Sequence, residues 1–374
     1  MCSLLQRKPN LNPQMKETPM SVFDHPDFDH HELVTFKDDP VSGLKAIIAV
    51  HNSTLGPALG GCRMFSYVSN VEALSDVLRL SRGMTYKSAL AGIALGGGKS
   101  VIIGNPYKDK SRQLLLAMGD FVNSLNGTYI TAEDSGTSVA DMTTISEKTA
   151  YVSGVINGEK HGGDPSPITA YGVYQGIVAS VAYQFKGDLK GVRIALQGIG
   201  KVGFHLARQL IEAGARVYAS DINPANIQRA VNQLGVIEVP LDDILSSDVD
   251  VLVPCALGGA INAQSIDIIK AKVVAGAANN QLATADMGAA LKQRGILYAP
   301  DYVINSGGII DVYYQTQGMR DRQKVNAHVD KIGATLKTIF TRSAQTGNAT
   351  SRIADELAEE ILAGDIGDIK EMSA

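Results

Sequence analysis

The stretch VRIALQGIGKVGFHLARQLIEAG, residues 192–214, decides the fold. An apolar run that fits a short strand leads into the pattern Gly-x-Gly-x-x-Gly at Gly198, Gly200 and Gly203, and a helix-compatible segment follows. The glycine pattern alone is weak evidence, but a strand before it and a helix after it are typical of a dinucleotide-binding unit. The alternative is a glycine turn that binds nothing in an α/β fold, and this context disfavours it.

The predicted cofactor contacts begin at this turn. Its glycines permit close backbone approach, and the following helix N-terminus offers unpaired N–H groups and positive dipole to a pyrophosphate. The next predicted strand ends at Asp221, at a spacing of about 20 residues where an acid can bind a ribose 2′-hydroxyl. A carboxylate there would repel a 2′-phosphate, so we predict NAD rather than NADP. The predicted contacts in the turn are Gly198, Ile199, Gly200, Lys201, Val202 and Gly203.

Further strands extend this unit to a domain. The runs 249–255, 272–280 and 295–300 are short and apolar, with helix-compatible stretches between several of the strands. Alternating strands and helices predict a parallel sheet covered on both faces. Because a chain of 374 residues is too long for one ordinary core, we predict an α/β protein of two domains. The Gly- and Pro-rich stretch 154–167 marks the boundary. The predicted domains are residues 1–153 and a doubly wound Rossmann-type domain over 154–334, with C-terminal helices from about 335 to 374 returning to the first domain.

Bulk composition excludes several function classes. The net charge of −4 gives no electrostatic support for a nucleic-acid or membrane partner. Cys2, Cys62 and Cys255 are odd in number and widely spaced, which argues against a disulfide framework and against a CxxC metal site. Residues 1–20 read as a loose polar tail without a secretory pattern. We therefore expect a cytoplasmic protein with no metal.

A second glycine-rich stretch, GGGKS at residues 96–100, raises the possibility of a phosphate-binding P-loop. A P-loop requires a glycine at the position of Ile93, and it opens a helix, whereas apolar β-branched residues follow Ser100. Both tests fail. We therefore predict that Lys99 matters for its amine, because a desolvated lysine has a lowered pKa and can act as a base. The alternative is that Lys99 is an ordinary surface lysine. The glycines and apolar residues that surround Lys99 in the sequence disfavour this alternative.

Other predicted elements bring candidate groups toward Lys99. A helix capped at Ser69 delivers Lys87 at its end, and strands are expected over 45–50, 100–103 and 129–132. Asp134 follows the last of these and could shuttle protons, although a turn or cap aspartate is the more ordinary role. The glycines before Lys99 are expected to leave room for substrate and backbone to approach its amine.

Together the motifs GPALGGCR, MTYKSALAG, LGGGKSVIIG, TAEDSGT, SPITAYGV, GIGKVG, PCALGG, AGAANNQL and YAPDYVINSGG make the chain similar to the leucine/phenylalanine/valine branch of the amino-acid dehydrogenases. The resemblance runs from about residue 45 to residue 308. It implies an N-terminal substrate-binding and oligomerisation domain, a cleft between the domains and a homo-oligomer. The implied reaction converts an L-amino acid, NAD and water reversibly into a 2-oxo acid, ammonium and NADH.

The resemblance also implies roles for residues. Lys87 would hold the substrate carboxylate, Lys99 would activate water, and Asp134 would exchange protons with Lys99 and with the substrate nitrogen. Asn280 would fix the amino group, helped at the carboxylate by backbone at Gly60 and Gly61. The expected cofactor neighbours are Thr169, Cys255, Ala256, Ala277 and Asn279, and the expected side-chain pocket is Leu59, Met84, Ala132, Ile309 and Val312.

Leu59 bears on the substrate, since similar glutamate enzymes carry a lysine there for the γ-carboxylate. A buried γ-carboxylate without a partner is costly, so an apolar amino acid is expected, with leucine, valine or isoleucine favoured. An aromatic (phenylalanine or tryptophan) dehydrogenase stays open, because one methylene discriminates by only about 1–3 kcal/mol. A non-catalytic dinucleotide-binding module would have no need of a base. Cys62, Phe65, Ser135 and Asp311 depart from the residues expected of leucine-specific members and leave the preference open.

Overall fold

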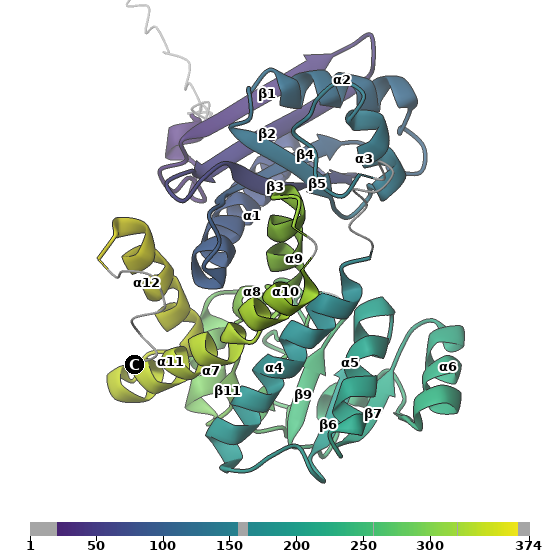
Figure 1. Cartoon of the computed structure of the whole chain (residues 1–374), viewed down its shortest axis with the longest axis vertical. Coiled ribbons are helices and arrows are strands. Elements are labelled where there is room, and N and C mark those ends of the chain that lie inside the picture. Colours follow the sequence, from purple (N-terminus) through teal and green to yellow (C-terminus); the bar gives the residue numbers. More distant parts are fainter. Residues whose placement is uncertain (1–20, 156–163, 257, 320, 366–374) are drawn as a thin grey trace, which may run out of the picture.

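The computed structural model describes residues 21–155, 164–256, 258–319 and 321–365 and contains two separate sheets, each with its own helices (Figure 1). The predicted α/β fold with a parallel-sheet dinucleotide-binding domain is confirmed. The predicted tail over residues 1–20 and residues 156–163 of the predicted boundary lie outside the described residues. The boundary itself therefore stays a prediction.

The N-terminal sheet has five strands in the order β1-β2-β4-β3-β5. Strands β1, β2 and β4 pair antiparallel, while β3 runs parallel to both β4 and β5. Alternate residues of β2 enter two different cores, because Ile48 packs toward α2 and α3 while Ile47 packs toward α1. The sheet is therefore buried on both faces. The bounds are β1 Leu33–Asp39, β2 Leu44–Asn52, β3 Ala58–Phe65, β4 Gly96–Ile103, β5 Tyr129–Glu133, α1 Asn70–Ala91, α2 Arg112–Asn123 and α3 Val139–Ile145, after a short 3-10 helix, η1 Val22–Asp24.

The glycines of GGGKS are strand residues of β4 and they serve packing. A Cβ atom at Gly97 would collide with the backbone nitrogen of Thr85 in α1, and one at Gly98 would lie 2.7 Å from the Tyr129 ring. The expectation that these glycines leave room for substrate was therefore wrong. They let α1, capped by Ser69 as predicted, lie directly on the strand that carries Lys99.

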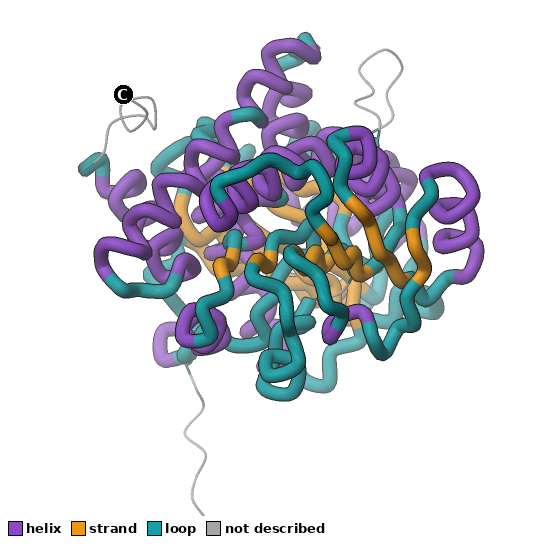
Figure 2. The backbone as a smooth tube through the Cα atoms, turned by 90° about the horizontal axis from the view of Figure 1, so that it is seen from below, coloured by secondary structure: helices purple, strands orange, loops and turns teal. Residues whose placement is uncertain are grey.

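The second sheet has six parallel strands in the order β11-β10-β9-β6-β7-β8. The order reverses between β6 and β9, which is the switch point where doubly wound sheets bind ligands. Helices α4, α5 and α11 cover one face, and the loop 261–271 with α7 covers the other. Figure 2 shows the orange strands with helices along one side and mainly loops along the other. The bounds are β6 Arg193–Gln197, β7 Arg216–Ser220, β8 Ile237–Glu238, β9 Val251–Pro254, β10 Val273–Val274, β11 Leu297–Tyr298, α4 Ser166–Phe185, α5 Lys201–Glu212, α6 Pro224–Leu234, η3 Ile244–Ser246 and α7 Asp286–Gln293.

Two differences from the predicted strands have simple causes. Only two residues each of 272–280 and 295–300 pair as β10 and β11, since both stretches leave the sheet early to form loops. Strand β8 was not predicted, because both of its residues, Ile237 and Glu238, are exposed and carry no apolar run.

The C-terminal helices connect the two sheets. Helix α12 contacts α1 of the N-terminal part and also α7 and α11 of the second part, and Figure 1 shows it beside α1. The bounds are α8 Asp301–Ile304, α9 Gly307–Thr316, α10 Arg322–Val329, α11 Lys331–Thr346 and α12 Thr350–Ala363. Within the described ranges, no helix has the length and apolar character that a bilayer crossing requires.

Close packing of α1 on β4 yields a first prediction. Gly97→Ala should lower the free energy of unfolding by about 1–3 kcal/mol, because the new methyl group would overlap helix backbone that cannot rotate away. Gly83→Ala is the matched control on α1, since a Cβ there meets no heavy atom within 4 Å and alanine favours the helix by roughly 0.5–1 kcal/mol. Urea unfolding measures both. Equal midpoints for the two variants would contradict the packing argument.

Candidate active site

Lys99 lies on β4 and is 6% exposed. Its amine forms an ion pair with Asp134, in the loop after β5. The strand register explains the meeting, because Ser100, Cys62 and Glu133 align across three neighbouring parallel strands. Lys99 and Asp134 each lie one position from this row, so their side chains point to the same face of the sheet. A Cβ at Gly61 would lie 2.7 Å from the Asp134 Cβ, so this glycine of the intervening strand makes space for the carboxylate.

Asp134 has a second cationic neighbour that the sequence analysis missed. The Nε of Arg63 lies 3.4 Å from Oδ2 of Asp134, and Nη1 of Arg63 lies 2.9 Å from Asp76. Burial disfavours the charged form of Asp134, but the attraction of Lys99 and then of Arg63 outweighs it and lowers the pKa of Asp134. The carboxylate is thus held ionised. Arg63 stands in the motif GPALGGCR, but no local pattern predicts which acid it faces.

Lys87 joins this group from α1. The pKa of Lys87 is lowered to about 8, mainly by burial and also by the charge of Lys99, while Asp301 and, to a smaller extent, Asp134 act to raise it. Asp301 is the first residue of α8, in the second part of the chain, and the sequence analysis missed it as well. The predicted residues Lys87, Lys99 and Asp134 therefore share one electrostatic environment, and an acid from the other sheet completes it.

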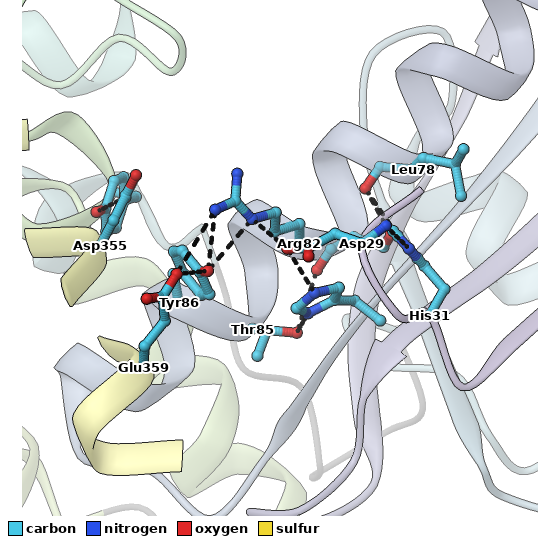
Figure 3. A network of polar contacts seen from close by, with 11 residues as sticks. Asp29, His31, Leu78, Arg82, Thr85, Tyr86, Asp355 and Glu359 are labelled. Atoms are coloured by element: carbon cyan, nitrogen blue, oxygen red, sulfur yellow. Dashed lines mark hydrogen bonds and ion pairs between the residues drawn. The ribbon is translucent and has the colours of Figure 1, made fainter. Parts of the chain in front are cut away.

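Neighbouring residues fix α1 through a polar network (Figure 3). The Tyr86 hydroxyl donates to Glu359 of α12 at 2.7 Å and accepts from the Arg82 guanidinium at 3.0 Å. Arg82 also pairs with Asp29 at 2.8 Å. The helix that carries Lys87 is thus anchored both to the N-terminal segment and to the C-terminal helix.

The glycine turn after β6 has the shape that a dinucleotide needs. Gly198 has a φ of 94° and lies against Ala256, while a Cβ at Gly203 would collide with the Gly198 carbonyl. At Gly200, the N-cap of α5, a Cβ would meet no heavy atom within 4 Å, and no side chain caps the helix. Two glycines therefore serve the turn and the helix packing, and the third leaves open space above free N–H groups. Asp221 accepts the Ile199 N–H at 2.7 Å, which joins the end of β7 to the turn.

The segment 276–281 borders the same edge of the second sheet. Asn280 has a φ of 52°, in the left-handed region, and both Asn279 and Asn280 are exposed. The Asn305 amide donates to the Ala277 carbonyl at 3.1 Å and to the Asn279 side chain at 2.8 Å.

Among the other expected cofactor neighbours, Ala256 is exposed, and Thr169 lies on α4 against Gly308. The Cys255 N–H donates to the Gln197 carbonyl at 2.8 Å, and burial raises the pKa of its thiol. A thiol with a raised pKa is a poor nucleophile.

Four residues of the predicted side-chain pocket share one apolar cluster, which extends through both parts of the chain; the pocket itself stays a prediction. Leu59 and Ile309 belong to one apolar cluster, and Met84 and Val312 pack against it. Ala132 is partly buried and is not a member of that cluster. Asp311, next to Val312, pairs instead with Gln315 at 2.9 Å and Arg322 at 3.4 Å, and burial raises its pKa. Its carboxylate is therefore already engaged.

Comparison with known proteins places these features in a family. Residues 30–151 match the model "Glu/Leu/Phe/Val dehydrogenase, dimerisation domain", and residues 225–361 match "Glutamate/Leucine/Phenylalanine/Valine dehydrogenase". Leucine dehydrogenase of Geobacillus stearothermophilus is 48% identical over 91% of this chain and 93% of its own length. The chain belongs to the Glu/Leu/Phe/Val dehydrogenase family. The resemblance drawn from the motifs is thereby confirmed.

Other members show how wide the family is. Valine dehydrogenase of Streptomyces virginiae is 44% identical over 90% of this chain and 95% of its own. The crystal structure of L-tryptophan dehydrogenase from Nostoc punctiforme superposes with a TM-score of 0.79 at 42% identity, over 90% of this chain and 96% of that chain. Members of this family that carry different names share the fold, so the pocket residues must decide the substrate.

The open space at Gly200 yields a second prediction. Gly200→Val should raise the Kd of NADH tenfold or more, which is about 1.4 kcal/mol, because the side chain would occupy the predicted pyrophosphate position. NADH fluorescence measures this directly, since the chain has no Trp. Gly187→Val is the control, at an exposed glycine of the same sheet's domain with no heavy atom within 4 Å of its Cβ. Unchanged NADH binding by Gly200→Val would show that the dinucleotide lies elsewhere.

Proposed function

We propose that the protein catalyses the NAD-dependent, reversible oxidative deamination of an apolar L-amino acid, with leucine, valine or isoleucine as the preferred substrate. The products are the 2-oxo acid, ammonium and NADH. The observation that carries the proposal is the buried Lys99–Asp134 ion pair beside a second lysine, Lys87. A module that only bound a dinucleotide would gain nothing from burying these charges, which costs several kcal/mol per ion.

The two lysines divide the work. Lys87, kept charged, binds the substrate carboxylate, with backbone at Gly60 and Gly61 beside it. The side chain of Asn280 holds the amino group. Asp134 first accepts the proton that the substrate ammonium releases. Bound NAD would supply the hydride acceptor, and loss of the hydride from Cα leaves an iminium. Lys99 then takes a proton from the water that attacks the iminium carbon.

Asp134 completes the proton transfers. It gives its proton to the substrate nitrogen and takes up the one that Lys99 holds, so that the carbon–nitrogen bond breaks with ammonia as the leaving group. As the carbonyl forms, the hydroxyl proton passes to the neutral Lys99 amine, and the released ammonia takes up a proton to become ammonium. The lowered pKa of Asp134 keeps it ready to accept each proton as a carboxylate, and its contact with Lys99 makes the path direct.

Residues at the sheet edge would hold the cofactor. The free N–H groups at Gly200 and Lys201 face the pyrophosphate, and Asp221 binds the ribose hydroxyls. The Asp221 carboxylate supports NAD over NADP, because it would repel a 2′-phosphate. None of its neighbours Ser220, Ile222 and Asn223 supplies a compensating positive charge. Thr169, Cys255, Ala256, Ala277 and Asn279 border the remaining length of the dinucleotide.

Leu59 supports an apolar substrate, because a lysine is absent where a γ-carboxylate would need one. A second candidate, an aromatic amino acid, is favoured by one observation: L-tryptophan dehydrogenase of Nostoc punctiforme is 46% identical over 88% of this chain, close to the leucine-specific relative. The matched dimerisation-domain model also supports a homo-oligomer. A cytoplasmic location stays a prediction from the sequence.

A substrate panel tests the proposal. Initial rates of NAD reduction should give the highest kcat/KM with leucine, isoleucine or valine, lower values with phenylalanine and tryptophan, and at least about a 100-fold lower value with glutamate, because its γ-carboxylate would be buried unpaired. Best turnover of an aromatic substrate would establish the second candidate. No turnover with any of them would falsify the enzymatic proposal, and a glutamate preference would refute the role of Leu59.

Removal of the proposed base gives a separate prediction. Lys99→Ala should lower kcat by about 10²–10⁴, while NADH binding by fluorescence stays unchanged. Lys110→Ala is the matched control, since Lys110 also forms a carboxylate pair, with Asp141 at 2.8 Å, at another place in the same sheet's domain. If Lys99→Ala kept the kcat of the control, Lys99 would not be the base.

A further inference from the structure

Helix α8 holds the segment 277–281 at both ends. Its first residue, Asp301, accepts the Gln281 N–H through Oδ2 at 2.9 Å and its neighbour's N–H, that of Tyr302, through Oδ1 at 2.7 Å. One helical turn later, Asn305 donates to Ala277 and Asn279, as described above. The loop that carries Asn280 is thus tied to α8 by side chains on either side of it.

This loop needs such support for two reasons. The left-handed φ of 52° at Asn280 is unfavourable for a residue with a Cβ. Asn280 also borders two overlapping cavities of about 840 Å³ each, so packing holds it on fewer sides than an ordinary core loop. Hydrogen bonds must then supply the rigidity that packing does not. Asp301 provides one that is charge-assisted, because both of its oxygens accept N–H groups.

Asp301, which belongs to the second sheet's domain, also acts electrostatically on Lys87 of the N-terminal part. It is the largest favourable influence on the charged form of Lys87, opposing burial and the repulsion of Lys99, with Asp134 contributing less. The titratable neighbours of Asp301 itself are Lys87, Tyr298, Tyr302 and Asp355. Burial raises the pKa of Asp301, and the N–H groups of Gln281 and Tyr302, together with Lys87, oppose this shift by favouring the carboxylate form.

We propose that Asp301 is a positioning residue for the substrate: it fixes the backbone that presents Asn280 and, because α8 packs against α1, it places a negative charge near Lys87 before substrate arrives. This inference rests on the proposed function, in which Lys87 and Asn280 bind the substrate. According to this inference, the Asp301 side chain affects both substrate contacts: that of Lys87 with the substrate carboxylate and that of Asn280 with the substrate amino group. The Asp301 carboxylate itself needs no contact with the substrate.

Kinetics give the first test. Asp301→Asn should lower kcat/KM for the amino acid about 10–100-fold, mainly through KM, and should move the alkaline fall of the kcat/KM profile to lower pH, because Lys87 loses its proton sooner. Asp355→Asn is the matched control: it removes a carboxylate from the same region, one bonded to the Tyr302 hydroxyl at 2.6 Å, and should leave that limb in place. Asp301→Ser, whose hydroxyl can still accept an N–H, replaces the asparagine variant if that one does not fold.

A second measurement does not depend on turnover. Trace acetylation of the full-length protein by acetic anhydride across pH, quantified at Lys87 by mass spectrometry, reports the pKa of its amine. We expect a fall of roughly one unit in Asp301→Asn and no change in Asp355→Asn. An unchanged Lys87 pKa in Asp301→Asn and Asp301→Ser overturns the inference. Absence of amino-acid oxidation by the wild-type protein would instead count against the proposed function, while the acetylation result would still decide how Asp301 acts on Lys87.

Discussion

A single buried ion pair, Lys99 with Asp134, constrains the surrounding structure. A lysine at 6% exposure is tolerable only with a compensating charge in contact, and the pair forms only if β4, β3 and β5 keep their register. Gly61 must lack a side chain for the carboxylate to fit. The glycine run of β4 lets α1 pack closely on the strand. Lys87 of α1 therefore lies near the Lys99–Asp134 pair. Loss of any of these would leave a buried charge unmatched.

The pair is part of a larger series of charged side chains. Asp76, Arg63, Asp134 and Lys99 follow one another through direct contacts, and Lys87 and Asp301 extend the group electrostatically across to the second sheet. Acids and bases are equal in number in this series. An amino acid enters as a zwitterion and preserves that balance, whereas glutamate would add an unmatched negative charge. The balance therefore favours the same substrates that Leu59 favours through its apolar side chain.

Local sequence was enough to predict some of this and not the rest. The Gly198–Gly203 turn is encoded within one strand, one loop and one helix, so its pattern could be recognised directly. Lys99 could be separated from a P-loop lysine because the register of the glycines and the order of elements are local as well. The purpose of Gly97 could not be predicted, because it depends on contact with Thr85 of a helix that precedes it. The roles of Arg63 and Asp301 could not be predicted for the same reason. Each residue acts on a charged side chain that is distant in the sequence, Asp134 for Arg63 and Lys87 for Asp301.

The site divides into a rigid part and a part that depends on how the two sheets sit. Lys99, Asp134 and Arg63 all belong to the N-terminal sheet, so their proton transfers and their mutual attraction are independent of the second sheet's position. Lys87 with Asp301 and Tyr86 with Glu359 join elements from both parts of the chain, and Leu59 and Ile309 belong to one apolar cluster that spans both parts. Those contacts concern binding of the carboxylate, binding of the side chain and anchoring of α1. A shift between the parts would therefore alter substrate affinity first and leave the Lys99–Asp134 pair intact.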